Sequence, residues 1–405
     1  MSIPTPAPAD RFARPIQGDG ARARVLHYLC TTARGGIEEH VLSLLAHLPA
    51  RGFRPYLAAP PDLLRQMGPE LTAIGARTIA VRRSSPWDFR DAAVLAATLS
   101  RERIAIVHSH LFVGSMFASP LARLAGVRAV VETFHLPEVW RMGKRLKRSF
   151  WLDRRMSRWV DRYVAVSAAA ARHLTDAKGI PAHKVRTIFN GRDLSRFHPA
   201  AAAERRQARA ALGLGLEPAV LLIGRLEPQK GHALMLEAAV VLKPMLPTVR
   251  ILFAGTGSLE RELRARSDAA GLTGTVNFLG YRPDPEVLLA AADVVVLPSR
   301  YEGLPLAAIE AMAAARPVVA TDIDGIREVV IDGSSGLLVR PGDVHGLARA
   351  VERLVRFPMA ARQFAINGRR RAERHFDVRR QVEETISLYQ ELLSPRRRVG
   401  DTTGR

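Results

Sequence analysis

The sequence predicts an α/β fold with two domains, each a doubly wound parallel sheet. Three observations support this prediction. The chain has 405 residues, which is too long for one hydrophobic core. Short apolar segments alternate with amphipathic helical segments, a pattern typical of parallel sheets. The alternation begins near residue 24 and begins again near residue 219, so one such unit follows another.

The composition limits the class of protein. Hydrophobic residues make up 47% of the chain, as in a globular protein, and no apolar run approaches the roughly 20 residues of a spanning helix. A single cysteine, Cys30, excludes an internal disulfide and a cysteine-based zinc cage. These facts predict a cytoplasmic protein. The net charge of +21 indicates a polyanionic partner, which is nucleic acid, an acidic membrane face or a phosphorylated substrate.

The first domain is expected over residues 21–199, after a Pro- and Ala-rich leader, 1–20, that is predicted to be disordered. A strand at 24–30 leads into a loop with Gly35 and Gly36, and a helix follows. Backbone N–H groups at such a helix start can approach an anion. A glycine pair alone is equally compatible with a tight structural turn.

Three histidines are expected just past the carboxyl ends of two strands. His108 and His110 follow a predicted strand at 104–107, and His135 follows one at 128–133. Each by itself is compatible with a hydrogen-bonded loop residue. No further ligands at tight spacing are visible, so no metal site is predicted. His135 is the most informative, because it can present a neutral imidazole to a ligand.

Residues 141–163 form the most basic segment. It holds nine Arg and Lys residues against two Asp, with aromatic residues between them. One interpretation is an amphipathic helix that lies on an anionic membrane. The other is a surface helix with a buried aromatic face and a solvated basic face. Further along, the alanine-rich run 199–204 is interpreted as a loop that contains the domain boundary.

The second domain, 205–377, repeats the pattern. A strand at 219–223 is followed by a loop with Arg225 and Lys230 and then by a helix. Two cations at a helix start suit a diphosphate, because charge-assisted hydrogen bonds add to the positive end of the helix dipole. Further strands are expected at 249–254, 276–279, 293–298, 317–320 and 337–339.

Two glutamates, Glu302 and Glu310, follow the buried strand 293–298, at the sheet edge where open α/β sheets bind ligands. Spacing alone is equally compatible with acidic residues favoured near a helix N-terminus. Asp322 and Asp324 look like a DxD metal motif, but the next acidic residues do not continue a calcium-loop spacing. No metal is therefore expected there.

Taken in order, these motifs resemble the retaining GT-B glycosyltransferases of family 4. The resemblance runs from about residue 22 to residue 393. The following segments carry it: Gly35–Gly36–Ile37–Glu38, Val166–Ser167, Asn190–Gly191–Arg192–Asp193, Gly224–Arg225–Leu226, Lys230–Gly231, Phe253–Ala254–Gly255–Thr256–Gly257, Phe278–Leu279–Gly280, Pro298–Ser299–Arg300–Tyr301–Glu302–Gly303–Leu304–Pro305, Glu310–Ala311–Met312 and Gly325–Ile326–Arg327–Glu328–Val329–Val330.

The resemblance implies transfer of a sugar from a nucleotide-diphosphate sugar to a glycan or lipid-linked acceptor, with retention of anomeric configuration. It implies no metal or other cofactor and no nucleic-acid partner. It also implies a helix at 378–394 that returns to the first domain, before a disordered basic tail at 395–405. The implied catalytic residues are Glu302 and His135. The diphosphate is expected at Arg225, Lys230, Gly35, Gly36 and the backbone of Leu304 and Leu306, the ribose at Glu310 (the second residue of an E-x7-E pair), and the base near Tyr281 and Arg282.

Two positions depart from the family pattern, since Pro305 and Asp324 stand where many relatives carry glycine. Both leave the identity of the sugar open. Two alternatives are an epimerase that acts on nucleotide sugars with the same architecture, and a basic protein without catalysis that binds a membrane or nucleic acid. The complete motif set favours the transferase. Peripheral contact of 141–163 with an anionic membrane on the inner face of the cell membrane stays open.

Overall fold

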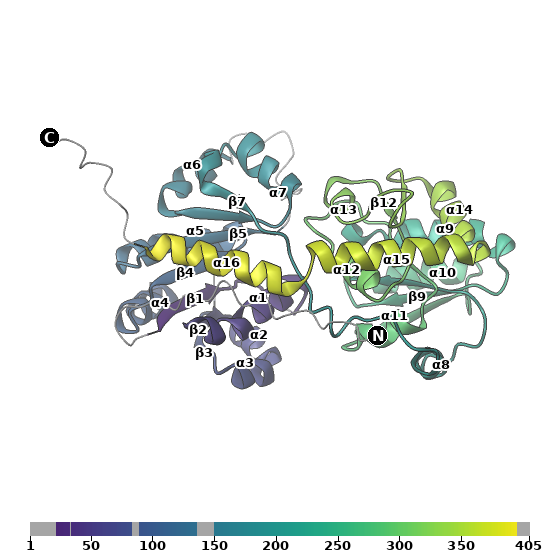
Figure 1. Ribbon diagram of the computed structural model, residues 1–405, viewed down its shortest axis with the longest axis horizontal. Helices are drawn as coiled ribbons and strands as arrows, with labels where there is room; N and C mark the ends of the chain where they lie inside the picture. Colours follow the sequence, from purple (N-terminus) through teal and green to yellow (C-terminus); the bar gives the residue numbers. More distant parts are fainter. Residues whose placement is uncertain (1–21, 33, 83–88, 136–149, 395–405) are drawn as a thin grey trace, which may run out of the picture.

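The computed structural model describes residues 22–32, 34–82, 89–135 and 150–394. It contains two parallel sheets with helices on both faces, side by side along the long axis of the molecule (Figure 1). The predicted α/β class is therefore confirmed. The predicted leader and basic tail lie outside the described residues.

The first sheet has seven strands in the order β3-β2-β1-β4-β5-β6-β7. They are β1 Ala23–Tyr28, β2 Phe53–Ala59, β3 Arg77–Ala80, β4 Ile106–His110, β5 Ala129–Phe134, β6 Arg162–Ala165 and β7 Val185–Thr187. The helices of this half are α1 Gly36–His47, α2 Pro61–Gln66, α3 Gly68–Ile74, α4 Phe89–Arg101, α5 Phe112–Leu124, α6 Phe150–Met156 and α7 Ala168–Arg172.

The second sheet has six strands in the order β10-β9-β8-β11-β12-β13. They are β8 Ala219–Ile223, β9 Arg250–Ala254, β10 Val276–Gly280, β11 Val294–Leu297, β12 Val318–Thr321 and β13 Leu337–Val339. The helices of this half are α8 Ala202–Ala211, α9 His232–Met245, α10 Glu260–Ala269, α11 Pro285–Ala291, α12 Leu306–Ala313, α13 Asp324–Arg327, α14 Val344–Arg356 and α15 Pro358–His375, and α16 Val378–Leu393 follows them in the chain.

Each sheet reverses its strand order once, between β1 and β4 in the first and between β8 and β11 in the second. Ligands of open α/β sheets bind at such reversals, beyond the carboxyl ends of the strands. Gly35 follows β1, Arg225 follows β8 and Glu302 follows β11. The loops that carry the predicted site residues thus begin at the two switch points.

The last helix, α16, packs on the first sheet although the preceding helix, α15, packs on the second (Figure 1). The crossing chain is held by backbone hydrogen bonds from Arg192 N–H to Phe376 and from Val378 N–H to Arg192, 2.8 and 3.0 Å long. Gly191 permits this approach, because a Cβ there would lie 2.6 Å from the Val378 Cα. The two segments of chain that pass between the halves are therefore hydrogen-bonded side by side.

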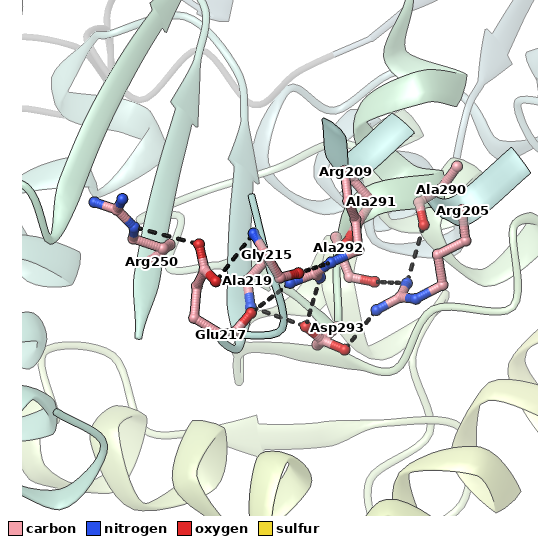
Figure 2. A network of polar contacts seen from close by, with 10 residues as sticks. All are labelled: Arg205, Arg209, Gly215, Glu217, Ala219, Arg250, Ala290, Ala291, Ala292 and Asp293. Atoms are coloured by element: carbon pink, nitrogen blue, oxygen red, sulfur yellow. Dashed lines mark hydrogen bonds and ion pairs between the residues drawn. The ribbon is translucent and has the colours of Figure 1, made fainter. Parts of the chain in front are cut away.

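The predicted loop at 199–204 is wrong for its last residues, because α8 begins at Ala202. Alanine favours helix, and the Glu204 carboxylate accepts a hydrogen bond from the Ala201 N–H, 2.8 Å away. Figure 2 shows how this helix is fixed: Arg205 and Arg209 reach the Asp293 carboxylate, at 2.6 and 3.3 Å. Because Asp293 precedes β11, α8 belongs with the second sheet.

The basic segment 141–163 is not one helix where it is described. Its residues 141–149 lie outside the described residues, α6 is short, and Tyr163 is buried in β6. The inward-facing Tyr163 agrees with the interpretation that the aromatic residues of this segment are buried. Trp151 on α6 does not, because it is 60% exposed. Among the described residues, no helix combines the length and the apolar composition that crossing a bilayer needs.

Candidate active site

The glycine loop of the first half lies against the start of α12 in the second half. Gly35 is the N-terminal cap of α1, and Gly36 is the first residue of that helix. A Cβ on Gly36 would touch the Leu306 side chain at 3.4 Å. The N-termini of α1 and α12 therefore lie close to each other, and Leu304 and Leu306 flank the cap residue Pro305 at this point.

Lys230 and Glu302 form the charged centre of the second half. The Lys230 ammonium lies 2.7 Å from a Glu302 carboxylate oxygen, which also accepts a hydrogen bond from the Ser299 hydroxyl at 2.8 Å. Glu302 is buried. The following Gly231 has φ +72°, and a Cβ there would lie 1.9 Å from the Pro298 carbonyl oxygen. Glycine is thus required for the loop after β8 to approach the loop after β11.

Glu310 is buried in α12, and its carboxylate pairs with the Arg192 guanidinium from the connection after β7. Burial raises the pKa of Glu310, and the nearby Arg192 charge opposes that rise. The Glu39 carboxylate on α1 also raises it. A residue predicted to meet a ribose is therefore paired with an arginine that the sequence does not single out.

Arg225 extends from the loop after β8 and is exposed. Its charge acts on Glu38 of α1, where it opposes the rise in pKa that burial causes. Glu38 is also hydrogen-bonded by the Thr31 hydroxyl. Arg225, Glu38 and the glycine loop consequently face the same space between the halves.

The residues predicted near the base lie after β10. Tyr281 is 63% exposed, and Arg282 forms two hydrogen bonds with the Asp284 carboxylate, at 2.7 and 2.6 Å. In the DxD pair, both Asp322 and Asp324 are paired with Arg327. This guanidinium holds the pKa of Asp322 below its usual range.

The histidines differ from the prediction. His108 and His110 lie within β4 and not beyond its end, so the alternation of a strand turns both toward the same face. His135 follows β5 directly, and all three are buried. The expectation that no further ligands lie nearby is also wrong, because two sets of three histidines have ring nitrogens within 4.8 Å of one another. They are His27, His108 and His110, and His40, His110 and His135.

Burial keeps these imidazoles neutral. It lowers the pKa of His27 to about 3, with a contribution from His40, and lowers the pKa of His40 to about 4. The pKa values of His108, His110 and His135 lie well below the usual value for the same main reason. At neutral pH each ring therefore carries one proton and presents one lone pair.

Two family models match the chain. The model described as Glycosyltransferase Family 4 matches residues 34–196, and the model described as Glycosyl transferases group 1 matches residues 204–371. The two matches together span both sheets. The chain belongs to glycosyltransferase family 4. This glycosyltransferase carries the family's two halves in their expected order.

Curated relatives agree. EpsD of Bacillus subtilis is 31% identical to the glycosyltransferase over 77% of this chain and 84% of the relative. Alpha-maltose-1-phosphate synthase of Mycolicibacterium smegmatis is 30% identical, over 88% of this chain and 96% of the relative.

Solved structures show the same architecture. HepE of Anabaena, in complex with UDP and glucose, has a TM-score of 0.81 at 19% identity and covers 91% of this chain and 100% of its own. Sucrose-phosphate synthase of Thermosynechococcus elongatus has a TM-score of 0.77 at 24% identity, with 92% and 99% covered. The fold of this glycosyltransferase is therefore GT-B.

The sequence does not single out several residues that hydrogen-bond to or pair with predicted site residues or their neighbours. Arg192 lies inside a segment that carries the family resemblance, and His27, His40 and Tyr389 lie inside apolar segments. The sequence signal for such residues is a polar side chain at a core-facing position of a strand or helix. It does not reveal which residues will meet, because their partners lie up to 362 positions away in the chain.

Proposed function

We propose that this glycosyltransferase moves a sugar from a nucleotide-diphosphate sugar to a glycan or lipid-linked acceptor. The reaction retains the anomeric configuration and needs no metal. The observation that carries the proposal is the approach of the α1 and α12 N-termini, where a Cβ on Gly36 would lie 3.4 Å from the Leu306 side chain. Two helix starts that face one space form an anion site from both sides.

Fixed positive charge supports a diphosphate at this place. Arg225 is exposed and its charge acts on Glu38, and Lys230 lies beside Glu302. As the glycosidic bond breaks, negative charge develops on the leaving nucleotide. Preorganised cations and helix dipoles stabilise that charge in the role that a metal ion serves elsewhere. Lys230 must then share its ammonium between Glu302 and a phosphate oxygen.

Glu302 and His135 are proposed to meet the sugar. The Glu302 carboxylate is held by Lys230 and Ser299, which fixes its position near the reacting centre. A carboxylate there can stabilise the oxocarbenium-like character that the sugar gains. Glu310 is proposed to take the ribose hydroxyls, which requires Arg192 to move aside or to share the carboxylate.

The acceptor side is proposed to be the first half, close to an anionic membrane on the inner face of the cell membrane. On α6, Trp151 and Leu152 are exposed beside the cations Arg154 and Arg155. An exposed apolar pair next to basic residues is typical of a surface that touches anionic lipid. A lipid-linked acceptor would meet the enzyme there.

A screen of nucleotide sugars by thermal shift tests the donor, followed by a transfer assay and NMR assignment of the product anomer. We expect one donor to raise the melting temperature and to yield product with the donor's anomeric configuration. We expect full activity in EDTA. An inverted product, or activity that EDTA abolishes and manganese restores, would contradict the corresponding part of the proposal. Release of an epimer without acceptor would identify the epimerase alternative, and salt-sensitive DNA binding without donor binding would identify the nucleic-acid alternative.

A further inference from the structure

A continuous chain of hydrogen bonds runs through the first half, from Thr133 to His135. Its links are Thr133 Oγ1 to His108 Nε2 (2.6 Å), His108 Nδ1 to the Tyr389 hydroxyl (2.5 Å), Tyr389 to His27 Nε2 (3.3 Å), His27 Nδ1 to His110 Nε2 (3.0 Å) and His110 Nδ1 to His135 Nε2 (3.0 Å). We call these six residues the histidine chain. Every member is buried.

The fold brings the chain together from three strands and one returning helix. In the sheet register His27 of β1 lies opposite His108 of β4, and His110 lies opposite Thr133 of β5. Tyr389 comes from α16, and its ring also packs edge-on against Phe53 at 5.8 Å. The return of α16 to the first half therefore supplies the link between His108 and His27.

Proton counting restricts the chain to two arrangements. Each neutral imidazole has one N–H and one acceptor nitrogen, and both ring nitrogens of His27, His108 and His110 are already used by neighbours. The buried Tyr389 hydroxyl has no other described acceptor for its single proton, so it donates to one histidine and accepts from the other. All five bonds then point the same way, either toward His135 or toward Thr133. One direction places the proton of His135 on Nδ1, and the other places it on Nε2.

Thr133 decides between the two directions. If the bonds pointed toward Thr133, its hydroxyl would accept from His108, and its own proton would need another acceptor. Thr133 is fully buried, and no described residue accepts from it. A buried hydroxyl proton without an acceptor is costly, so the bonds point toward His135. His110 then donates to His135 Nε2, which leaves the His135 proton on Nδ1.

We propose that His108, Tyr389, His27 and His110 are positioning residues that hold His135 as its Nδ1–H tautomer, so that this imidazole donates a hydrogen bond to an oxygen of the sugar. The remaining nitrogen, Nδ1, has no hydrogen-bond partner among the described residues. In this arrangement His135 is a neutral donor and not a general base. The identity of the oxygen rests on the proposed function, whereas the tautomer does not.

A metal ion is the competing explanation for so many histidines. His40 argues against it in the second set. Its Nδ1 accepts from the Gln381 amide at 2.9 Å, because the Gln381 oxygen is engaged by the Gly191 N–H at 2.6 Å. The His40 proton is consequently on Nε2, so this nitrogen offers no lone pair. In the first set every nitrogen already has a hydrogen-bond partner.

Nitrogen NMR of the full-length enzyme labelled with ¹⁵N-histidine tests the tautomer directly, with His135 assigned through a His135→Asn variant. We expect the Nδ1–H form in the wild type. Tyr389→Phe keeps the ring that packs on Phe53 and removes only the hydroxyl, and Thr133→Val removes the hydroxyl at the far end. In both we expect a mixture of tautomers for His135 and about a tenfold fall in kcat, with the donor KM unchanged. Thr133→Ser, which keeps the hydroxyl, should behave as the wild type.

Three outcomes overturn the proposal. They are an Nε2–H form of His135 in the wild type, an unchanged tautomer in both Tyr389→Phe and Thr133→Val, and stoichiometric zinc in the purified enzyme with histidine resonances that shift when the zinc is removed. If no nucleotide sugar binds or reacts, the proposed function fails, but the tautomer measurement in the free enzyme still decides the role of the histidine chain.

Discussion

The two halves of this glycosyltransferase fix buried polar side chains by different physical means. In the first half, the buried histidines of β1, β4 and the end of β5, with Tyr389, are neutral groups that hydrogen-bond to one another. The second half uses full charges in pairs, with Glu302 against Lys230. Between them, Glu310 of the second half pairs with Arg192 of the domain connection.

The difference follows from what each half is proposed to hold. A leaving diphosphate gains charge, and fixed charges stabilise it best when they are paired and ready before the donor binds. A sugar carries neutral hydroxyls, for which a single oriented N–H is a suitable partner. Neutral buried networks depend on complete satisfaction of every hydrogen bond, whereas ion pairs depend on both partners being present. The two halves should therefore fail under different perturbations.

Acid should break the first half before the second. A histidine whose pKa is lowered in the folded state stays neutral there, while the unfolded chain takes up a proton below about pH 6.5, so stability is lost as pH falls toward the folded pKa. For His27 and His40 that window extends down to about 3 and about 4. Within this pH window, each such histidine should lower the free energy of unfolding by about 1.4 kcal/mol for each unit by which the pH falls. His27, His40, His108, His110 and His135 share this behaviour in the first half, against His232 and His375 in the second.

Urea unfolding between pH 7 and pH 5, followed by hydrogen exchange resolved to each half, measures this loss. His27→Gln should make the free energy of unfolding less dependent on pH, by the contribution of one histidine. His198→Gln provides the matched control, because His198 is exposed. Two results together would contradict the role of the buried histidines in acid sensitivity. Both halves would lose hydrogen-exchange protection equally, and the free energy of unfolding of His27→Gln would depend on pH as in the wild type.

Removing Arg192 should have the next largest effect, on stability. Arg192→Leu leaves the Glu310 carboxylate buried without its cation, which typically costs about 3–5 kcal/mol. Denaturant unfolding at pH 7 measures the loss, and the double variant Arg192→Leu with Glu310→Gln should recover most of it. Arg266→Ala is the control, since the exposed pair of Arg266 and Glu237 is worth about 0–1 kcal/mol. If Arg192→Leu lowered the free energy of unfolding as little as the control does, the Arg192–Glu310 pair would not be desolvated.

Lys230→Ala should weaken transfer by about 2–5 kcal/mol in kcat/KM, because a desolvated charge contact with the diphosphate is lost. Steady-state kinetics with the identified donor measures the effect, and calorimetry with the nucleoside diphosphate separates binding from chemistry. Lys243→Ala is the matched control, since Lys243 lies on the far end of α9 and donates to the Gly271 carbonyl. Undiminished kcat/KM in Lys230→Ala would remove the diphosphate assignment.

The smallest effect is expected at the DxD pair. Asp322 is partly exposed and paired with Arg327, so Asp322→Asn should alter kcat/KM by less than about twofold and stability by about 0–1 kcal/mol. The same kinetics with and without manganese checks this. A large loss that is confined to manganese-containing buffer would reinstate the metal interpretation of the motif.

Most of the fold could be predicted from the sequence, because the signals are local. The glycines after β1 and β8, the apolar run of β11 and the helical period of α16 each depend on a few neighbouring residues. The exceptions have local causes too. The alanine-rich start of α8 adjoins the domain boundary, where a loop is expected, but alanine favours helix. His108 and His110 lie inside a buried strand, where polar side chains are unusual, so the sequence predicts them beyond its end.

By itself the sequence determined the order of strands, loops and helices, and therefore the family and the residue types that each loop carries. Tertiary structure alone decided which of these residues meet. Parallel strands place residues side by side that are far apart in sequence, as His27 and His108 are, and the return of α16 adds Tyr389 to them. The Arg192 and Glu310 pair likewise exists only because the connection between the halves passes the start of α12. The periodicity of a sequence shows which face of a helix or strand a residue lies on. Which residues of different elements then come into contact depends on the strand order and on how the two halves pack.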